Sequence, residues 1–347
     1  MRFYIVVVAF VLLCLVSGCM KNRITATNKD HTTGRYGNEI PSGIVSDEIG
    51  KITQSVKKVY SVSSYTTYQF KREAMITGYH LYQGTFKKAA WGVISTNETV
   101  FGTATVIGFT NSTVALLTCA HVLNSPDTLI SYFDPVGEDP SYYIQSVSIK
   151  EKQENWVKDI SSCGSFTILA SDNTADIAFL GKKCENLTDS VTPFPVPSGS
   201  ARELGWGNLV YVFGYPMGNQ VMTSGIVSLS VKRPMGEFTV DALMNKGFSG
   251  GIILAHRGGT PDFELVGMVK SVNSSREVYL KPSSDQERTP DWMPYKGALF
   301  VEKSDNLQYG LNAVVPMESI LDFYIKNRKD LIRNGYNLDH FFLPEKK

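Results

Sequence analysis

The chain has 347 residues, with 34 Lys and Arg against 33 Asp and Glu and a formal net charge of +1. This length is enough for one large domain or two compact lobes, and the balanced charge argues against nucleic acid as a partner. Tyr and Phe are plentiful, and short apolar runs separated by polar residues recur along the chain, a pattern that favours β structure.

The amino terminus has the pattern of an export signal. Arg2 precedes an apolar run, residues 5–16, that is too short for a comfortable membrane span. Ser17 and Gly18 stand directly before Cys19, which resembles a bacterial lipobox, where the signal is cut before a cysteine that is then lipidated. We therefore expect residues 1–19 to be a lipoprotein signal peptide; a plain signal peptide or an uncleaved anchor is the alternative.

Cys19 would then carry a lipid that holds the protein on a membrane. The expected location is the bacterial cell envelope: outer membrane or periplasm in a Gram-negative cell, cell surface in a Gram-positive one. Residues 20–54 are rich in Thr, Asn, Ser and charge, and we expect a flexible tether there.

Three cysteines remain beyond the signal: Cys119, Cys163 and Cys184. An exported protein reaches a compartment that permits one disulfide among them. The bond between Cys163 and Cys184 is favoured because Cys119 lies in a strongly apolar run, but the sequence does not decide the pairing.

The first half of the chain predicts a β lobe. Residues 52–60 are compatible with a short helix or a strand, and residues 65–70, 75–82 and 90–95 with strands. Residues 101–109 and 114–123 then predict a hairpin of two buried strands, the second of which ends in His121.

Two carboxylates follow, and they differ in their surroundings. Asp176 directly precedes the apolar run Ile177–Leu180, which places it at the start of a buried strand. A buried aspartate needs a partner, and a histidine ring N–H is a suitable one. Asp172 lies among turn-forming residues, where a solvated side chain is expected, so we favour Asp176.

Residues 246–251, Lys-Gly-Phe-Ser-Gly-Gly, have the composition of a nucleophilic turn around Ser249. Glycines permit backbone torsions that other residues avoid, and the amides of Gly247 and Ser249 are candidates to bind an oxyanion. An ordinary tight turn is one alternative. Another is the Gly-x-Ser-x-Gly nucleophile elbow, which the same residues satisfy.

Chain order separates these alternatives. An elbow serine is followed by its acid and its histidine, yet only His256 and His340 come after Ser249, and neither is well placed. His121, Asp176 and Ser249 stand in the order of the chymotrypsin triad.

Several blocks carry a resemblance to trypsin-like serine proteases, and most closely to the HtrA/Deg-type bacterial branch. They are the histidine region 116–123, the aspartate region 176–180, the paired strands 208–229 and the serine turn. The resemblance covers residues 55–325 and implies an all-β fold of two six-stranded antiparallel Greek-key β-barrels with a short C-terminal helix. The barrels are expected at residues 55–185 and 203–316, and a C-terminal tail at 326–347, which is too short for the PDZ domain common in that branch.

The resemblance also implies the activity, that of a serine endopeptidase that cleaves protein or peptide substrates through an acyl-enzyme. His121 acts as the general base, Asp176 holds its imidazole, Ser249 is the nucleophile, and the amides of Gly247 and Ser249 form the oxyanion hole. No metal and no cofactor are expected, and the oligomeric state is left open.

Leu243, six residues before the serine, is expected by resemblance at the base of the substrate pocket. Val266, Gly267 and Met268 lie in the next strand, which lines this pocket in the family. An apolar base favours small or medium aliphatic side chains. Residues 272–308 are an insertion that covers the cleft or simply decorates the surface.

Two alternatives to an active peptidase remain. The first is a binding protein on a protease fold that has lost its activity. The second is an α/β-hydrolase esterase, which would require a mostly parallel sheet with helices on both faces.

Overall fold

The computed structural model of the chain describes residue 36 and residues 45–134, 143–229, 237–257, 263–282 and 299–343. The expected signal peptide, Cys19 and most of the expected tether lie outside these residues, so the export signal and the lipid anchor stay predictions. No helix in the described part is long and apolar enough to cross a membrane.

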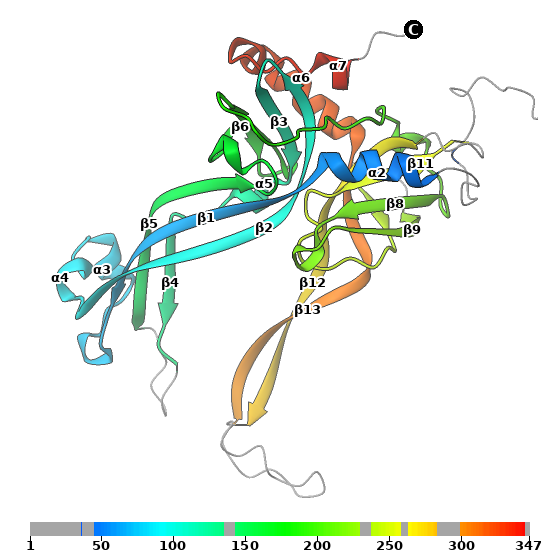
Figure 1. The fold of residues 1–347 in the computed structure, drawn as a ribbon. Coiled ribbons are helices and arrows are strands. Elements are labelled where there is room, and N and C mark those ends of the chain that lie inside the picture. Colours follow the sequence, from blue (N-terminus) through cyan, green and yellow to red (C-terminus); the bar gives the residue numbers. More distant parts are fainter. Residues whose placement is uncertain are drawn as a thin grey trace, which may run out of the picture. The chain divides into compact units, whose positions relative to one another are not determined.

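The first lobe is a seven-stranded antiparallel sheet with the strand order β4-β5-β1-β2-β3-β7-β6 (Figure 1). Its strands are β1 (Val56–Gln69), β2 (Gly92–Thr110), β3 (Thr113–Thr118), β4 (Thr128–Tyr132), β5 (Ile144–Val157), β6 (Thr167–Asp172) and β7 (Ile177–Lys183). β1 alternates between buried and partly exposed residues, as expected for a strand whose two faces meet different surroundings.

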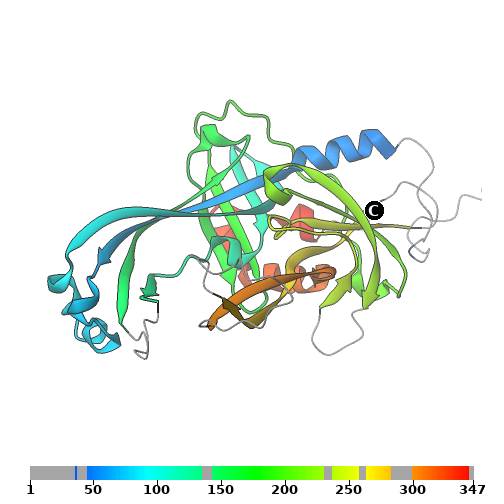
Figure 2. The same cartoon turned by 90° about the horizontal axis from the view of Figure 1, so that it is seen from below.

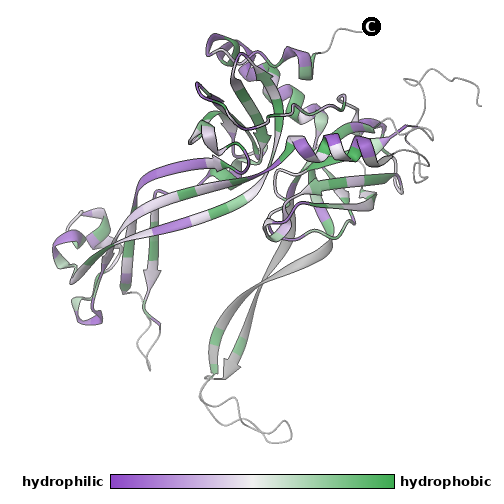
Figure 3. Cartoon of the chain, viewed as in Figure 1, coloured by the Kyte–Doolittle hydropathy of each residue, from purple (hydrophilic) through white to green (hydrophobic). Residues whose placement is uncertain are grey.

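The second lobe is a closed six-stranded barrel with the order β10-β13-β12-β11-β8-β9. Its strands are β8 (Leu209–Gly214), β9 (Val221–Leu229), β10 (Phe238–Val240), β11 (Ile252–His256), β12 (Phe263–Pro282) and β13 (Leu299–Pro316). The central strands of both lobes, β3, β8 and β11, are rich in the apolar residues that Figure 3 colours green, and they supply the cores.

The expected fold class is confirmed: two antiparallel β lobes with few helices. The second lobe is the expected six-stranded barrel, whereas the first is a seven-stranded sheet that does not close into a barrel. Every strand pairing within the two sheets is antiparallel. This overturns the esterase alternative, which required a mostly parallel sheet.

The helices of the described residues are short, except at the two ends of the fold. They are α2 (Val45–Ser55), α3 (Gly78–Tyr82), α4 (Phe86–Ala89), α5 (Ala120–Leu123), α6 (Met317–Arg333) and α7 (Asp339–Phe342), with 3-10 turns at Arg72–Ala74, Ser161–Cys163, Ala201–Glu203 and Pro216–Gly218.

Residues 52–60 contain both expected elements, because α2 ends at Ser55 and β1 begins at the next residue. The strand expected at 75–82 is wrong: Thr77 caps α3 through a capping box with His80.

β1, β2, β5 and β4 extend beyond the lobe as an arm that carries α3 and α4 at its end (Figure 1, Figure 2). The arm has its own apolar cluster, with Phe70, Phe86, Ile144 and Val147 at its centre. Hydroxyl groups join its strands, since Thr67 Oγ1 lies 2.7 Å from Thr96 Oγ1 and 2.8 Å from Ser148 Oγ. The arm is therefore internally packed.

The expected insertion at 272–308 lies largely in a second extension. β12 and β13 remain paired out to Pro282 opposite Leu299, as a long hairpin whose connecting residues lie outside the described part (Figure 1).

The C-terminal helices pack against the first lobe. The centroid of the Phe179 ring, in β7, lies 5.0 Å from the centroid of the Phe323 ring and 5.8 Å from that of the Phe342 ring. Tyr324 stacks on Phe342 at 4.4 Å and donates a hydrogen bond to Asp339 Oδ1 at 2.7 Å. The residues after 325 thus form part of the core of this lobe.

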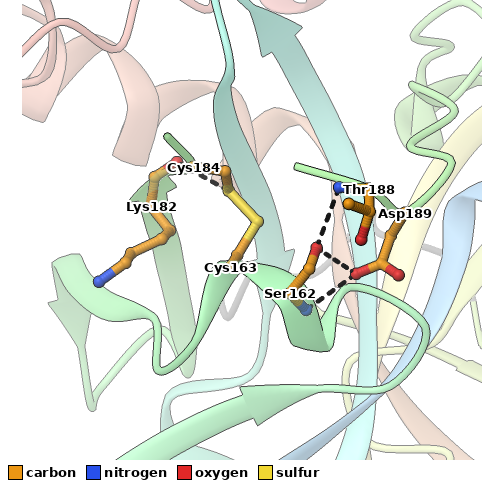
Figure 4. The surroundings of a disulfide bond; sticks show 6 residues. All are labelled: Ser162, Cys163, Lys182, Cys184, Thr188 and Asp189. Atoms are coloured by element: carbon orange, nitrogen blue, oxygen red, sulfur yellow. Dashed lines mark hydrogen bonds between the residues drawn. A yellow bond between two sulfur atoms is a disulfide. The ribbon is translucent and has the colours of Figure 1, made fainter. Parts of the chain in front are cut away.

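A disulfide joins Cys163 to Cys184, the pairing that the sequence favoured, across 4.8 Å between the Cα atoms (Figure 4). Ser162 beside it donates its backbone N–H to Asp189 Oδ2 at 2.9 Å. Cys119 is buried and unbonded to another cysteine.

Candidate active site

His121 lies just after β3, where the chain leaves the central hairpin of the first lobe. β3 ends at Thr118, and α5 turns the chain so that the His121 side chain is 46% exposed while its neighbours Ala120 and Val122 are buried. An apolar strand followed by one helical turn therefore presents a single imidazole at the surface of the lobe.

Asp176 reaches this imidazole from a tight turn. The turn is organised by Asp172, whose Oδ1 accepts hydrogen bonds from the N–H groups of Thr174 at 2.9 Å and Ala175 at 3.0 Å. Asp176 itself adopts a left-handed conformation, φ 58°, immediately before β7. Asp is among the few residue types that tolerate this conformation, and it directs the side chain back toward α5.

The Asp176 carboxylate binds His121 twice. Oδ1 accepts from the backbone N–H of His121 at 2.9 Å, and Oδ2 lies 2.8 Å from Nδ1. A carboxylate accepts at this distance, which assigns the ring proton to Nδ1 and leaves Nε2 as the basic nitrogen. The carboxylate is only 7% exposed, so water does not compete for these bonds.

The turn around Ser249 requires glycine at two positions. Gly247 has φ +105°, and a Cβ built there would lie 2.4 Å from Tyr215 O. Gly250 has φ +84°, and a Cβ built there would lie 2.0 Å from Thr103 O. Larger residues are thus excluded both by torsion and by space. Phe248 between them is buried in the second barrel.

Within residues 247–251, the amides of Gly247 and Ser249 have no acceptor among the described residues. The other three are engaged, Phe248 N with Asn245 O, Gly250 N with Val269 O and Gly251 N with Phe248 O. The two amides expected to form an oxyanion hole therefore both lack a protein acceptor.

Thr103 of β2 connects the serine turn to the first lobe. Its hydroxyl donates to Gly247 O at 2.8 Å and accepts from Tyr215 N at 2.9 Å, and its backbone N–H donates to Ser249 O at 2.8 Å. Sequence reasoning assigned no role to this residue. The only signal was a pair of threonines, Thr103 and Thr105, in a buried run that is otherwise apolar.

Because the Thr103 side chain is fully buried, losing its hydroxyl leaves two backbone groups without partners. We expect Thr103→Val to lower the free energy of unfolding by about 2 kcal/mol, and Thr103→Ser, which keeps the hydroxyl, by less than about 1 kcal/mol. Urea unfolding followed by tryptophan fluorescence measures both. Equal midpoints for the two variants would show that the hydroxyl does not join the lobes.

Gly102 marks the place where the two halves of the site meet. A Cβ there would lie 2.7 Å from Val122 Cγ2, next to His121, and 2.9 Å from Ser249 O. Within the described residues no hydrogen bond joins the His121 ring to the Ser249 hydroxyl. Such bonds are often long in the absence of substrate.

The ligand atoms of Cys119, His121 and Asp176 lie within 4.8 Å of one another, close enough to hold a metal ion. Burial raises the pKa of the Cys119 thiol well above its ordinary value, and the Asp176 carboxylate adds to this effect. A metal ligand must be a thiolate, whereas the Cys119 thiol donates to Val269 O at 3.1 Å. The protonated thiol of Cys119 therefore argues against a metal site. The three residues fit a hydrogen-bonded histidine–aspartate pair beside a buried thiol better.

The residues expected to form the substrate pocket are dispersed. Leu243 is 73% exposed, Val266 is buried in the core of the second barrel, and Met268 is buried in the core shared with the first lobe. A Cβ built on Gly267 would lie 2.7 Å from Val314 Cγ1 in the neighbouring strand β13. The aliphatic pocket stays a prediction.

A histidine–aspartate pair on one antiparallel β lobe, beside a glycine-rich serine turn on the other, is the arrangement of a trypsin-like peptidase. Residues 102–268 match the family model of the trypsin-like peptidase domain. The matched range contains all three expected catalytic residues, so the chain carries a peptidase domain of the hydrolase class.

Among solved structures, the chain is similar to an HtrA-type protease, AlgW, determined with a tripeptide. The two share 15% sequence identity with a TM-score of 0.40; the similarity covers 85% of this chain, which spans about 65% of the length of that one. No curated protein sequence matches the chain. Support for a trypsin-like peptidase comes from the domain match.

Proposed function

We propose that the protein is a serine endopeptidase of the HtrA/Deg type, with His121, Asp176 and Ser249 as its triad. The observation that carries this proposal is the doubly bonded His121–Asp176 pair beside a serine turn with two unengaged amides. The sequence blocks around His121, Asp176 and Ser249 support the branch.

Each residue has a defined step in the reaction. His121 Nε2 takes the proton of Ser249 Oγ as this oxygen bonds to the substrate carbonyl carbon, and the amides of Gly247 and Ser249 receive the resulting oxyanion. The imidazolium then donates its proton to the leaving amine, and the peptide bond breaks. Water attacks the acyl ester with His121 again as base, which releases the acid and restores Ser249.

Asp176 serves both halves of this cycle. Its two hydrogen bonds hold the ring with Nε2 outward, and its negative charge stabilises the imidazolium that forms twice per turnover.

The proposal includes export and lipid anchoring at Cys19, in the cell envelope of a bacterium, for which the support is the sequence of residues 1–19 alone. Substrates are proteins or peptides. A Cys19→Ser protein that still partitions into the detergent phase of Triton X-114 would contradict the anchor.

A fluorophosphonate probe tests the triad directly, because it phosphonylates only a serine that an adjacent base activates. We expect the protein to label at Ser249, as located by peptide mass spectrometry, and Ser249→Ala to remain unlabelled. Ser228, in β9 of the same barrel, provides the matched control, since Ser228→Ala should label like the wild type. A folded protein that does not label would favour the alternative of a binding protein on a protease fold.

A further inference from the structure

The arm ends in a segment that exposes several aromatic side chains. Residues 71–91 connect β1 to β2 and contain a 3-10 turn, α3 and α4, and we call them the arm tip (Figure 1, Figure 2). Tyr79 is 69%, Tyr82 88% and Trp91 62% exposed. Large apolar side chains that gather on one surface segment, rather than occurring singly, mark a site of interaction.

The fold presents these rings to solvent from ordered elements. Tyr79 and Tyr82 lie three residues apart on α3, so their side chains leave the same face of the helix. Leu81, between them, packs on the apolar cluster of the arm. Trp91 directly precedes Gly92, where the ladder between β1 and β2 begins. The positions of all three rings are therefore set by the backbone of the arm.

The arm does not use these three rings in its own core. Phe86 lies in that core, with its ring centroid 5.5 Å from that of Tyr68 and 6.3 Å from that of Phe70. Ile76 and Ile144 are buried in the same cluster. Because these side chains already supply the apolar burial that holds the arm together, the exposed rings contribute little to folding and remain available to a partner.

The arm tip has an excess of positive charge. Its sequence contains four cations and one acid: Lys71, Arg72, Lys87 and Lys88 against Glu73. Asp134 is a second acid beside it, and its backbone carbonyl accepts a hydrogen bond from Arg72 Nη1 at 2.9 Å. Among the described residues, no carboxylate forms an ion pair with any of the three lysines. Their ammonium groups are thus available to an anionic surface.

Aromatic rings combined with lysines suit a lipid surface better than a protein surface. Trp and Tyr prefer the boundary between headgroups and acyl chains, because each ring has an apolar body and one polar group. Lysine is attracted to anionic headgroups, whereas the buried core of a protein interface is depleted in lysine. Three of the four cations of the arm tip are lysines. Its charge and its rings therefore complement an anionic bilayer.

We propose that the arm tip binds the surface of an anionic lipid bilayer, with the rings of Tyr79, Tyr82 and Trp91 at the level of the headgroups and the lysines against lipid phosphates. The proposal goes beyond the peptidase function and does not depend on it. It is also independent of the lipid expected at Cys19. One weak membrane signal gives reversible binding and two give stable binding, so the arm tip supplies a second contact to a protein anchored elsewhere in its chain.

The test uses the chain from Met20 onward, the whole of the expected mature protein, made without the signal and therefore without lipid. All described residues lie within it. Sedimentation with sucrose-loaded vesicles of phosphatidylcholine and phosphatidylglycerol measures the partition coefficient. We expect Trp91→Ala, and the double variant Tyr79→Ala/Tyr82→Ala, each to lower it about tenfold, because each removes apolar surface that enters the interface. Vesicles of phosphatidylcholine alone should also bind at least about tenfold less, since they do not attract the lysines.

Trp206→Ala is the matched control, because Trp206 is also highly exposed, at 75%, but lies just before β8 in the second lobe. We expect its partition coefficient to stay within about twofold of the wild type. Circular dichroism checks that each variant is folded, which we expect because all the changed side chains are exposed.

Quenching by phosphatidylcholine with brominated acyl chains locates the contact. Vesicles that contain this lipid should quench the tryptophan fluorescence of the bound wild-type protein. Trp91→Phe, which keeps an apolar ring, should still bind and should lose most of this quenching.

Three results would overturn the proposal: no sedimentation with the anionic vesicles, equal partition of the wild type and the arm-tip variants, or unchanged quenching in Trp91→Phe. It would also be overturned if light scattering showed a dimer that Trp91→Ala dissociates without any change in vesicle binding, because a second copy would then cover the rings. Fluorophosphonate labelling at Ser249 is measured on the same samples, so a failure of the peptidase function is seen separately from a failure of membrane binding.

Discussion

Ser249→Ala should lower kcat for peptide hydrolysis by about 10⁶-fold, His121→Ala by a similar factor, and the double variant by no more than either single change. The physical reason is that the base and the nucleophile act in one step. Once Ser249 is gone, His121 has no proton to remove, and without His121 the hydroxyl is a weak nucleophile. The residual rate comes from binding and from the amides of Gly247 and Ser249.

Progress curves with a fixed peptide substrate measure this loss, and circular dichroism checks that each variant is folded. His340→Ala is the matched control, because His340 is exposed in α7 and was the histidine that a nucleophile elbow would have required. We expect that variant to retain wild-type kcat. A double variant whose loss is the product of the two single losses would mean that His121 and Ser249 act independently, against the triad.

Asp176→Asn should lower kcat by about 10⁴-fold with little effect on folding. The asparagine amide keeps the shape of the carboxylate, and its oxygen can still accept from the backbone N–H of His121. Its NH₂ group, however, would face Nδ1 and can only donate. The imidazole must then place its proton on Nε2, where the general base is needed.

Asp172→Asn is the matched comparison for this change. Both carboxylates belong to one turn, but Asp172 accepts only from the backbone of Thr174 and Ala175, a role that an amide oxygen can keep. We expect kcat within about twofold of the wild type, measured with the same substrate across pH 6 to 9. A loss at Asp172 that matched the loss at Asp176 would refute the assignment of the acid.

Local sequence was informative about the secondary structure near the site. The apolar runs before His121 and after Asp176 correspond to β3 and β7, and the runs on either side of Ser249 correspond to β10 and β11. These strands are short, bounded by turn residues and buried, which is the situation in which pattern and structure agree. The segment 75–82 differs, because a capping box and packing against the arm cluster outweigh its apolar content.

The contacts between the lobes were beyond reach of the sequence. Nothing local marks Thr103 as the partner of Gly247 and Tyr215, which lie more than a hundred residues away. The local sequence does not predict the packing of Phe341 and Phe342 against the first lobe either, because this packing depends on where α6 ends and on how the chain then turns back.

By itself the sequence determined which residue types stand where chemistry is expected: a histidine after a buried strand, an aspartate before one, and a serine between glycines whose space and torsion exclude side chains. The tertiary structure alone decided that the Asp176 carboxylate binds both the ring and the backbone N–H of His121, and that Thr103 joins the serine turn to the first lobe. Torsional preference and hydrophobic periodicity are properties of short segments, whereas hydrogen bonds between strands distant along the chain exist only once both lobes have closed around their cores.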